Sequence, residues 1–200
     1  MRLKLTALAV AAVMATTAQA QTTPDNLALA HRLVEDQAGG TDYVTRIGQS
    51  ALAGFDRLTR NSQDATLAAR RAAIQQALAE SRPDIVQLED QLAGVYAANL
   101  GAAELSGWIA FLESPEGKSI QAKKVQAGWP LAQPDLTPAE ADAQHAFDTS
   151  AIGQSITAKN GVILGQSLTF MSAFQARIGT RANAIYCATA KTCPDAPPAS

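Results

Sequence analysis

Cysteine and histidine are scarce in this chain of 200 residues, which has two of each. So few thiol and imidazole ligands exclude most zinc and iron–sulfur sites. Positive charge is not in excess either, because 16 Lys and Arg residues stand against 18 Asp and Glu residues, for a net charge of −2. Such a chain has no electrostatic footprint for nucleic acid. With 47% hydrophobic and 17% charged residues, it is too apolar to be disordered and has the length for a sizeable core.

Long apolar runs are confined to the first residues, where residues 5–14 are too short for a stable membrane span. Arg2 and Lys4 precede this run, and the small-residue triplet Ala18-Gln19-Ala20 follows it. This order is typical of a secretory signal peptide and favours it over an N-terminal core helix. We therefore expect residues 1–20 to be removed and the mature chain to start at Gln21. The protein would then be secreted across the inner membrane to the periplasm, with no membrane span in the mature chain.

The two cysteines, Cys187 and Cys193, lie near the C-terminus with five residues between them. In an oxidising compartment this spacing favours a disulfide, and closing such a short loop stabilises a fold by ~2 kcal/mol. A redox-active pair is the alternative, although such pairs usually have C-x-x-C spacing at a helix N-terminus. Two free thiols are the third possibility.

The pattern of apolar residues predicts an all-α protein, because they recur at spacings of three and four and alanine is abundant. We expect one domain of seven or eight helices over residues 21–193, followed by a flexible tail at 194–200. Thr23-Pro24-Asp25 and Thr137-Pro138-Ala139-Glu140 are typical helix starts, the second being a capping box. The expected helices cover about 24–38, 43–58, 64–82, 85–100, 105–112, 115–127 and 151–186, with one more that starts at Pro138 and a proline-rich connector at 128–135. Gly161 and Gly165 should bend the last helix or let another helix approach closely.

An internal repeat is visible in the second half of the chain. Residues 101–125 align with residues 137–161 without gaps, and ten of the 25 positions are identical. Unrelated segments of average composition share about two. Seven identities are not alanine, and six of these lie in the pattern F-x-x-S-x-x-G-x-S-I-x-x-K.

This pattern has a structural interpretation as a helix corner. Phe111 and Phe147 would anchor the end of one helix in the core. Ser114 and Ser150 are placed to cap the next helix by accepting a hydrogen bond from a backbone N–H two or three residues later. Pro115 fits the first position of that helix in the first copy. The absence of a Cβ at Gly117 and Gly153 would permit close contact with the preceding helix.

The same stretch resembles a known bacterial family. Residues 95–120, VYAANLGAAELSGWIAFLESPEGKSI, are similar to the core of the family called domain of unknown function 2059. The positions that carry this resemblance are Tyr96, Glu104, Phe111, Ser114, Pro115, Gly117 and Lys118. It covers about residues 85–127, with 137–161 as a degenerate second copy that lacks the proline, and Leu112 stands where a second aromatic is usual. The resemblance implies an exported, mostly periplasmic, α-helical protein and implies no known activity or catalytic residues.

Residues suited to metal binding or acid–base chemistry are few. His31 shares a helical face with Glu35 and lies close to Asp36, a pattern more typical of a surface pair than of a metal site. His145 lies among Glu140, Asp142 and Asp148, where a surface or partly buried histidine is again the simpler interpretation. The pair Glu89-Asp90 would support acid–base chemistry only in a cleft, and an exposed polar face is the more common case. We predict no metal and no cofactor.

The sequence also lacks motifs for nucleophilic and phosphate chemistry. There is no G-x-S-x-G, no G-x-G-x-x-G and no Walker pattern, and Ser114 is better explained as a helix cap. The densest basic group consists of Lys118, Lys123, Lys124 and Lys159. It would form a solvated face or else meet an anionic ligand or lipid head group.

These observations favour a non-catalytic module that binds an apolar or peptide-like partner, either a protein or a small molecule, in a groove between helix pairs. The reasons are that the expected helices carry many apolar residues and that the sequence lacks catalytic motifs. One alternative is an envelope hydrolase with an unfamiliar site around His145 and its neighbouring acids. Another is a structural or stress-related component of the cell envelope.

Overall fold

The computed structural model describes residues 23–38, 42–127 and 134–190, and these residues form eight α-helices. The predicted all-α fold is therefore confirmed. The signal peptide, the tail at 194–200 and most of the proline-rich connector lie outside the described residues. The helices are α1 (Pro24–Gln37), α2 (Tyr43–Thr59), α3 (Leu67–Glu80), α4 (Arg82–Asn99), α5 (Ala102–Glu113), α6 (Pro115–Ala127), α7 (Pro138–Thr149) and α8 (Ala151–Ala190).

Short polar side chains begin several of these helices. Thr23 Oγ1 accepts a hydrogen bond from the backbone N–H of Asn26 at 3.2 Å, as the predicted start of the first helix requires. Thr137 Oγ1 accepts from the N–H of Glu140 at 3.3 Å, which completes half of the predicted capping box. The third helix is shorter than the predicted 64–82. It ends at Glu80, and Pro83 lies in the first turn of α4, where a missing N–H costs nothing.

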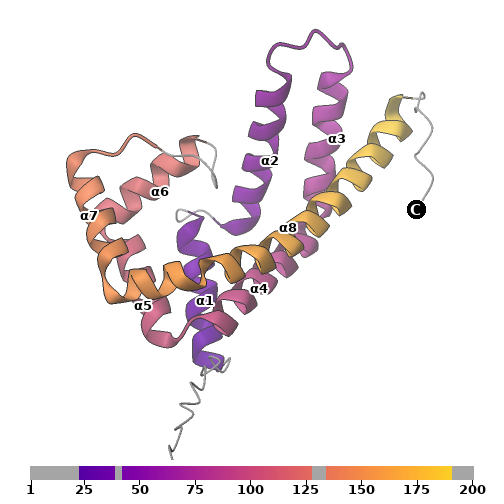
Figure 1. Ribbon diagram of the computed structural model, residues 1–200. Coiled ribbons are helices and arrows are strands. Elements are labelled where there is room, and N and C mark those ends of the chain that lie inside the picture. Colours follow the sequence, from indigo (N-terminus) through magenta and orange to yellow (C-terminus); the bar gives the residue numbers. More distant parts are fainter. Residues whose placement is uncertain (1–22, 39–41, 128–133, 191–200) are drawn as a thin grey trace, which may run out of the picture.

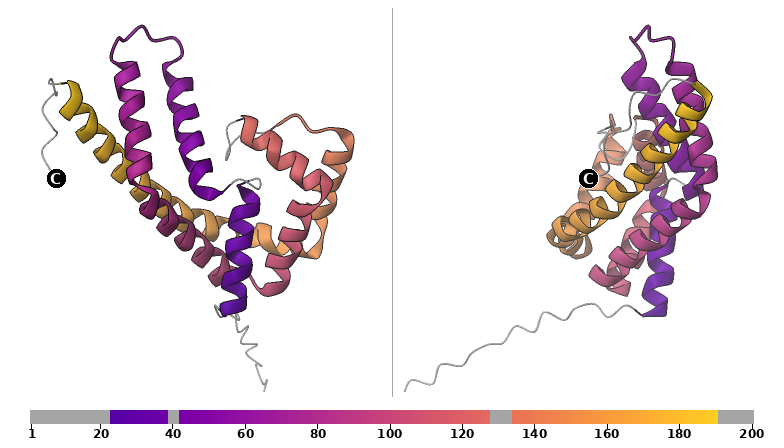
Figure 2. Two further views of the ribbon diagram at one scale, coloured as in Figure 1. Left: turned by 180° about the vertical axis from the view of Figure 1, so that it is seen from behind. Right: turned by 90° about the vertical axis from the view of Figure 1, so that its right-hand side faces the viewer.

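The long helix α8 packs against helices from both halves of the chain. From its start beside α7 and α5, it runs along α4 and then along α3 (Figure 1). On the other side of the body, α1 packs against α4 and α5, while α2 and α3 form a hairpin that extends from it (Figure 2). The core between these helices is aliphatic, and its fully buried large side chains are Leu33, Ile85, Leu88, Leu100, Leu105 and Ile120.

Gly161 and Gly165 leave α8 unbroken, and a Cβ at either position would meet nothing within 4 Å. The expected close approach of another helix at these two glycines is therefore wrong. The stripe of α8 that contacts the body passes through Ile156, Ile163 and Phe174, and both glycines lie on the exposed part of the helix.

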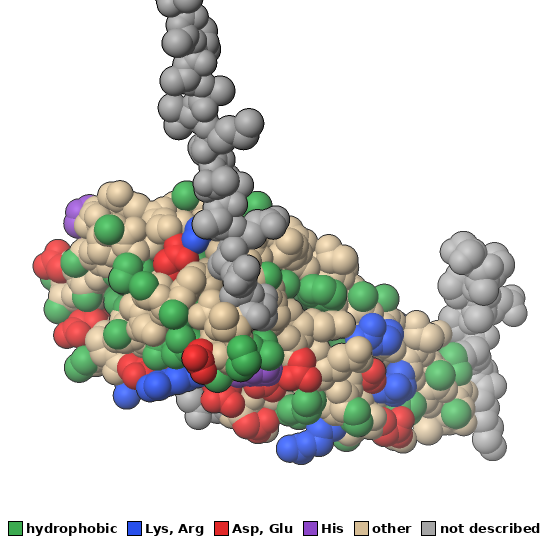
Figure 3. All heavy atoms as spheres, turned by 90° about the horizontal axis from the view of Figure 1, so that it is seen from below, with side chains coloured by type: hydrophobic (Ala, Val, Ile, Leu, Met, Phe, Trp, Pro, Cys, Tyr) green, Lys and Arg blue, Asp and Glu red, His purple; other side chains and the backbone are tan. Residues whose placement is uncertain are grey.

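Charged side chains of both signs are interspersed over the lower face of the molecule (Figure 3). Among the described residues, no helix combines the length and the apolar character that a membrane span requires.

Candidate functional site

Helices α5 and α6 meet at a sharp corner whose pivot is Ser114. The chain at Ser114 is extended, with φ −64° and ψ 158°. Its Oγ donates a hydrogen bond to the carbonyl of Phe111 at 2.7 Å and accepts one from the N–H of Gly117 at 3.0 Å. The hydroxyl therefore caps the end of α5 and the start of α6 at the same time. Pro115 takes the first position of α6.

Helices α7 and α8 meet at a second corner with nearly the same geometry. Ser150 has φ −66° and ψ 158°. Its Oγ donates to the carbonyl of Phe147 at 2.6 Å and accepts from the N–H of Gly153 at 3.0 Å. Every one of these contacts joins residues 36 positions after their counterparts in the first corner.

The two corner glycines lie against the helix that precedes them. A Cβ on Gly117 would stand 1.9 Å from the carbonyl oxygen of Phe111, and one on Gly153 would stand 2.1 Å from that of Phe147. Backbone atoms cannot yield by this amount without opening the corner. Both positions therefore require glycine for the close packing of the corner.

The corners hold each other through a carboxylate at the start of α7. Glu140 is only 5% exposed, and it accepts hydrogen bonds from Ser119 Oγ and Lys123 Nζ of α6, each at 2.5 Å, and from the N–H of Thr137 at 2.7 Å. The bonds from Lys123, from Ser119 and from the Thr137 backbone stabilise the charged form and lower the pKa of Glu140 to about 2.

Glu104, at the start of α5, accepts equivalent hydrogen bonds from side chains of α8. It accepts hydrogen bonds from Ser155 Oγ, from Lys159 Nζ at 2.6 Å and from the N–H of Gly101 at 2.7 Å. Burial by itself would raise the pKa of Glu104, but these bonds outweigh it and lower the pKa below its ordinary value. We call the two sets of contacts the reciprocal clasps, because each corner supplies the carboxylate for the serine and lysine of the other.

Aromatic rings pack against one another where the two corners meet. The rings of Phe111 and Phe147 are stacked, with centroids 4.5 Å apart and planes 14° from parallel. Beside them, Tyr96 of α4 and Trp108 of α5 make an edge-to-face pair at 5.8 Å. The hydroxyl of Tyr96 donates to Gln37 Oε1 at 3.0 Å, which ties the cluster to the end of α1.

A pocket of about 410 Å³ opens at this junction, within the range of small-molecule sites. Four aromatic rings contribute to its wall, namely Tyr96, Trp108, Phe111 and Phe147. The polar side chains at its wall are Gln37, Gln121, Lys124, Gln144, Asp148, Thr157 and Asn160. We call it the junction pocket.

Gln121 is the most buried polar residue of the junction pocket, with 7% of its surface exposed. Its Oε1 is buried and accepts no hydrogen bond from the part of the chain that the structure describes. An unpaired buried carbonyl of this kind costs about 1–3 kcal/mol. A hydrogen-bond donor that reached this oxygen would recover that cost.

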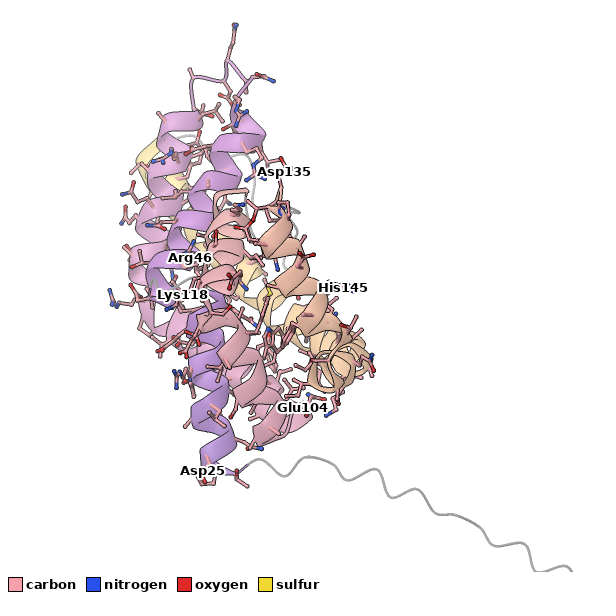
Figure 4. The ribbon with its side chains drawn as sticks, turned by 90° about the vertical axis from the view of Figure 1, so that its left-hand side faces the viewer. Asp25, Arg46, Glu104, Lys118, Asp135 and His145 are labelled. Atoms are coloured by element: carbon pink, nitrogen blue, oxygen red, sulfur yellow. The ribbon has the colours of Figure 1, made fainter. Side chains whose placement is uncertain are left out.

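Of the acids singled out around His145, Asp148 lies at the wall of the junction pocket and Glu140 belongs to a reciprocal clasp, whereas His31 and His145 lie outside the pocket. His31 Nε2 is 3.7 Å from Asp90 Oδ1, so its partner comes from α4 and not from the neighbouring Glu35. His145 is exposed on α7, and Figure 4 shows it well apart from Glu104. Within the described ranges, no three His, Cys, Asp or Glu side chains are grouped so as to hold a metal ion.

Two of the basic side chains have a role that the sequence did not reveal. Lys123 and Lys159 were expected to be solvated or to meet an anionic ligand, but they belong to the reciprocal clasps. The signal for this was present, since Glu, Ser and Lys recur at equal positions in the two copies. Cys187 lies near the end of α8, whereas Cys193 lies outside the described residues, so the predicted disulfide stays a prediction.

Comparison with known proteins supports the resemblance found in the sequence. Residues 86–129 match the model of a family described as an uncharacterized protein conserved in bacteria (DUF2059). The match spans most of α4 and all of α5 and α6, and it ends before the second corner. No curated protein and no solved structure matches the chain.

Proposed function

We propose that this protein is an exported, periplasmic binding protein without catalytic activity, and that the junction pocket receives an apolar or peptide-like ligand. The observation that carries the proposal is the pocket itself, whose wall includes four aromatic side chains and a buried amide whose oxygen is unpaired among the described residues. Such sites bind through apolar surface and a few polar groups that set the orientation of the ligand. Export is supported by the composition of the first twenty residues.

The arrangement of acids favours binding over hydrolysis. A hydrolase centred on His145 would need a neighbouring carboxylate to orient the ring or activate water. Glu140, the buried acid on the same helix, is already saturated by Ser119, Lys123 and Thr137. The carboxylate of the junction pocket, Asp148, accepts a hydrogen bond from Gln144 at 2.8 Å.

The proposal includes an origin of the pocket by internal duplication. Residues 101–125 and 137–161 would be two copies of one helix corner, paired about an approximate twofold axis. Exchanging the two corners replaces α5 by α7 and α8 by α6. The contact of α5 with α8 should then recur as a contact of α7 with α6, and both contacts are present. The reciprocal clasps and the Phe111–Phe147 stack obey the same exchange.

Fluorescence of Trp108 tests the binding site. Trp129→Phe leaves Trp108 as the single tryptophan, and the variant is purified from the periplasmic fraction, where its mass should correspond to a chain that starts at Gln21. We expect the apolar probe 1-anilinonaphthalene-8-sulfonate to bind with a rise in its emission and quenching of Trp108. Thr157→Phe, which fills the pocket from an exposed position of α8, should weaken binding by about tenfold or more.

Ala158→Phe is the matched control, because Ala158 is also exposed on α8 and does not contribute to the pocket. It should leave the affinity for the probe unchanged. Absence of probe binding, or equal binding by the Thr157→Phe variant, would overturn the site. A purified chain that retains residues 1–20 would contradict export with cleavage.

A further inference from the structure

The wall of the junction pocket is built from equivalent positions of the two corners, yet their chemistry differs. Five pairs of residues 36 positions apart contribute to it: Trp108 and Gln144, Phe111 and Phe147, Leu112 and Asp148, Gln121 and Thr157, Lys124 and Asn160. Among these pairs only the phenylalanines are identical. The identical residues Ser114 and Ser150, Glu104 and Glu140, and Lys123 and Lys159 build the corners and the reciprocal clasps, while the identical positions Gly153 and Ile156 also reach the pocket wall. The frame is thus symmetric, while the pocket presents different groups on its two sides.

The α6 side offers a cation next to the buried amide. Lys124 follows Gln121 by three positions, so the two side chains share a face of the helix. Lys124 is half-buried, and within the described residues its ammonium has no ion-pair partner. The adjacent Lys123 differs, because it is held by Glu140. Among the residues that the structure describes, the pocket wall therefore carries a lysine without an ion-pair partner within one helical turn of an unpaired acceptor.

The other groups at the wall restrict what fits beside this pair. Trp108 and Phe111 give apolar surface on the same corner. On the α7–α8 side, Thr157 and Asn160 are neutral, and Asp148 carries a negative charge. That charge repels a polyanion such as phosphate more strongly than it repels a single carboxylate, so a monoanion fits this wall better than a phosphate does.

We propose that the junction pocket binds the C-terminal end of a peptide or an N-acyl amino acid. The terminal carboxylate would pair with Lys124, the last amide N–H would donate to Gln121 Oε1, and an apolar terminal side chain would lie against Trp108 and Phe111. A terminal residue carries its N–H and its carboxylate on one Cα, which suits side chains separated by a single turn. This inference rests on the proposed function and adds the class of ligand to it.

The test compares two probes that differ only in their terminal charge. N-acetyl-Gly-Leu with a free carboxylate and N-acetyl-Gly-Leu amide are titrated into the Trp129→Phe protein at low ionic strength, with Trp108 emission as the readout. We expect the acid to bind about tenfold more tightly than the amide, as a charge-assisted contact allows. Lys124→Gln should abolish that difference, and Gln121→Leu should weaken both probes.

Lys118→Gln is the matched control for charge. Lys118 is exposed on α6, six positions before Lys124, and does not contribute to the pocket (Figure 4). It should leave the ratio of the two affinities unchanged. Equal binding of acid and amide by the parent protein would overturn the inference without any variant, so loss of folding in a variant leaves the test intact.

The outcomes separate this inference from the proposed function. If neither peptide probe binds but the apolar probe still does so and is blocked by Thr157→Phe, the peptide inference fails and the binding function stands. If the apolar probe and both peptide probes all fail to bind, both proposals fall.

Discussion

The glycines of the two corners show what single residues contribute to this molecule. Gly117 and Gly153 lie against the last carbonyls of the preceding helices, whereas Gly161 and Gly165 have open space around the position of a Cβ. All four are helical, so the local backbone does not distinguish them. The effect of an added methyl group on stability therefore depends on which atoms of this chain lie next to each glycine.

We expect Gly117→Ala and Gly153→Ala each to lower the free energy of unfolding by about 2–3 kcal/mol or more, because the methyl group would force the corner open. Gly161→Ala and Gly165→Ala are the matched controls. Each should raise it by about 0.5–1 kcal/mol, since alanine is the better helix former at an open position. Urea denaturation followed by circular dichroism measures all four. A corner variant as stable as its control would contradict the close packing.

At the scale of elements, the reciprocal clasps explain how α6 and α7 are joined across a connector. Glu140 accepts hydrogen bonds from α6 while it also caps its own helix, so one carboxylate serves both purposes. Glu104 does the same between α5 and α8. Each acid accepts hydrogen bonds through both of its carboxylate oxygens. A side chain with a single acceptor oxygen could not make all of these bonds.

The clasps make stability depend on acid pH. The pKa of Glu140 in the folded protein is about 2 and lies below its unfolded value of 4.5, so its contribution is complete above about pH 5 and is lost as the pH falls toward 2. The lowered pKa of Glu104 acts in the same direction. Asp36 and Glu89 act in the opposite direction, because burial raises the pKa of both.

Glu140→Gln should therefore lower the Tm at pH 7 by about 4–8 °C, as expected for the loss of charge-assisted hydrogen bonds in a domain of this size. It should also flatten the decline of Tm between pH 5 and pH 2. Asp142→Asn, an exposed acid on the same helix, is the control and should follow the parent curve. Scanning calorimetry across this range provides the test. A Glu140→Gln curve parallel to that of the parent would show that the clasp does not hold the acid in its charged form.

At the scale of the whole molecule, local signals predicted the helices well. The all-α class follows from periodicity, and Thr23 and Thr137 begin α1 and α7 as their patterns indicated. Local sequence failed where contacts between distant elements decide the outcome. One of its two interpretations of Gly161 and Gly165 was a close approach of another helix that does not occur, and it left Lys123 and Lys159 without partners in the chain.

The junction pocket lay beyond prediction for a related reason. Its wall combines the end of α1 with parts of α4, α5, α6, α7 and α8, and no single segment carries a pattern for it. The internal alignment directs attention to identical positions, which serve the frame. The positions that differ between the copies, such as Gln121 and Lys124, supply most of the pocket wall and have no signal in that alignment.

The most direct test of the account is an NMR titration that locates the bound probe. On addition of 1-anilinonaphthalene-8-sulfonate, we predict that the indole N–H of Trp108 and the side-chain amides of Gln121, Gln144 and Asn160 shift together with one affinity. The side-chain amide of Gln154, exposed on α8 outside the pocket, should stay in place. Shifts confined to residues outside the junction pocket, or no shifts at all, would contradict the claim that two helix corners join to form a binding site.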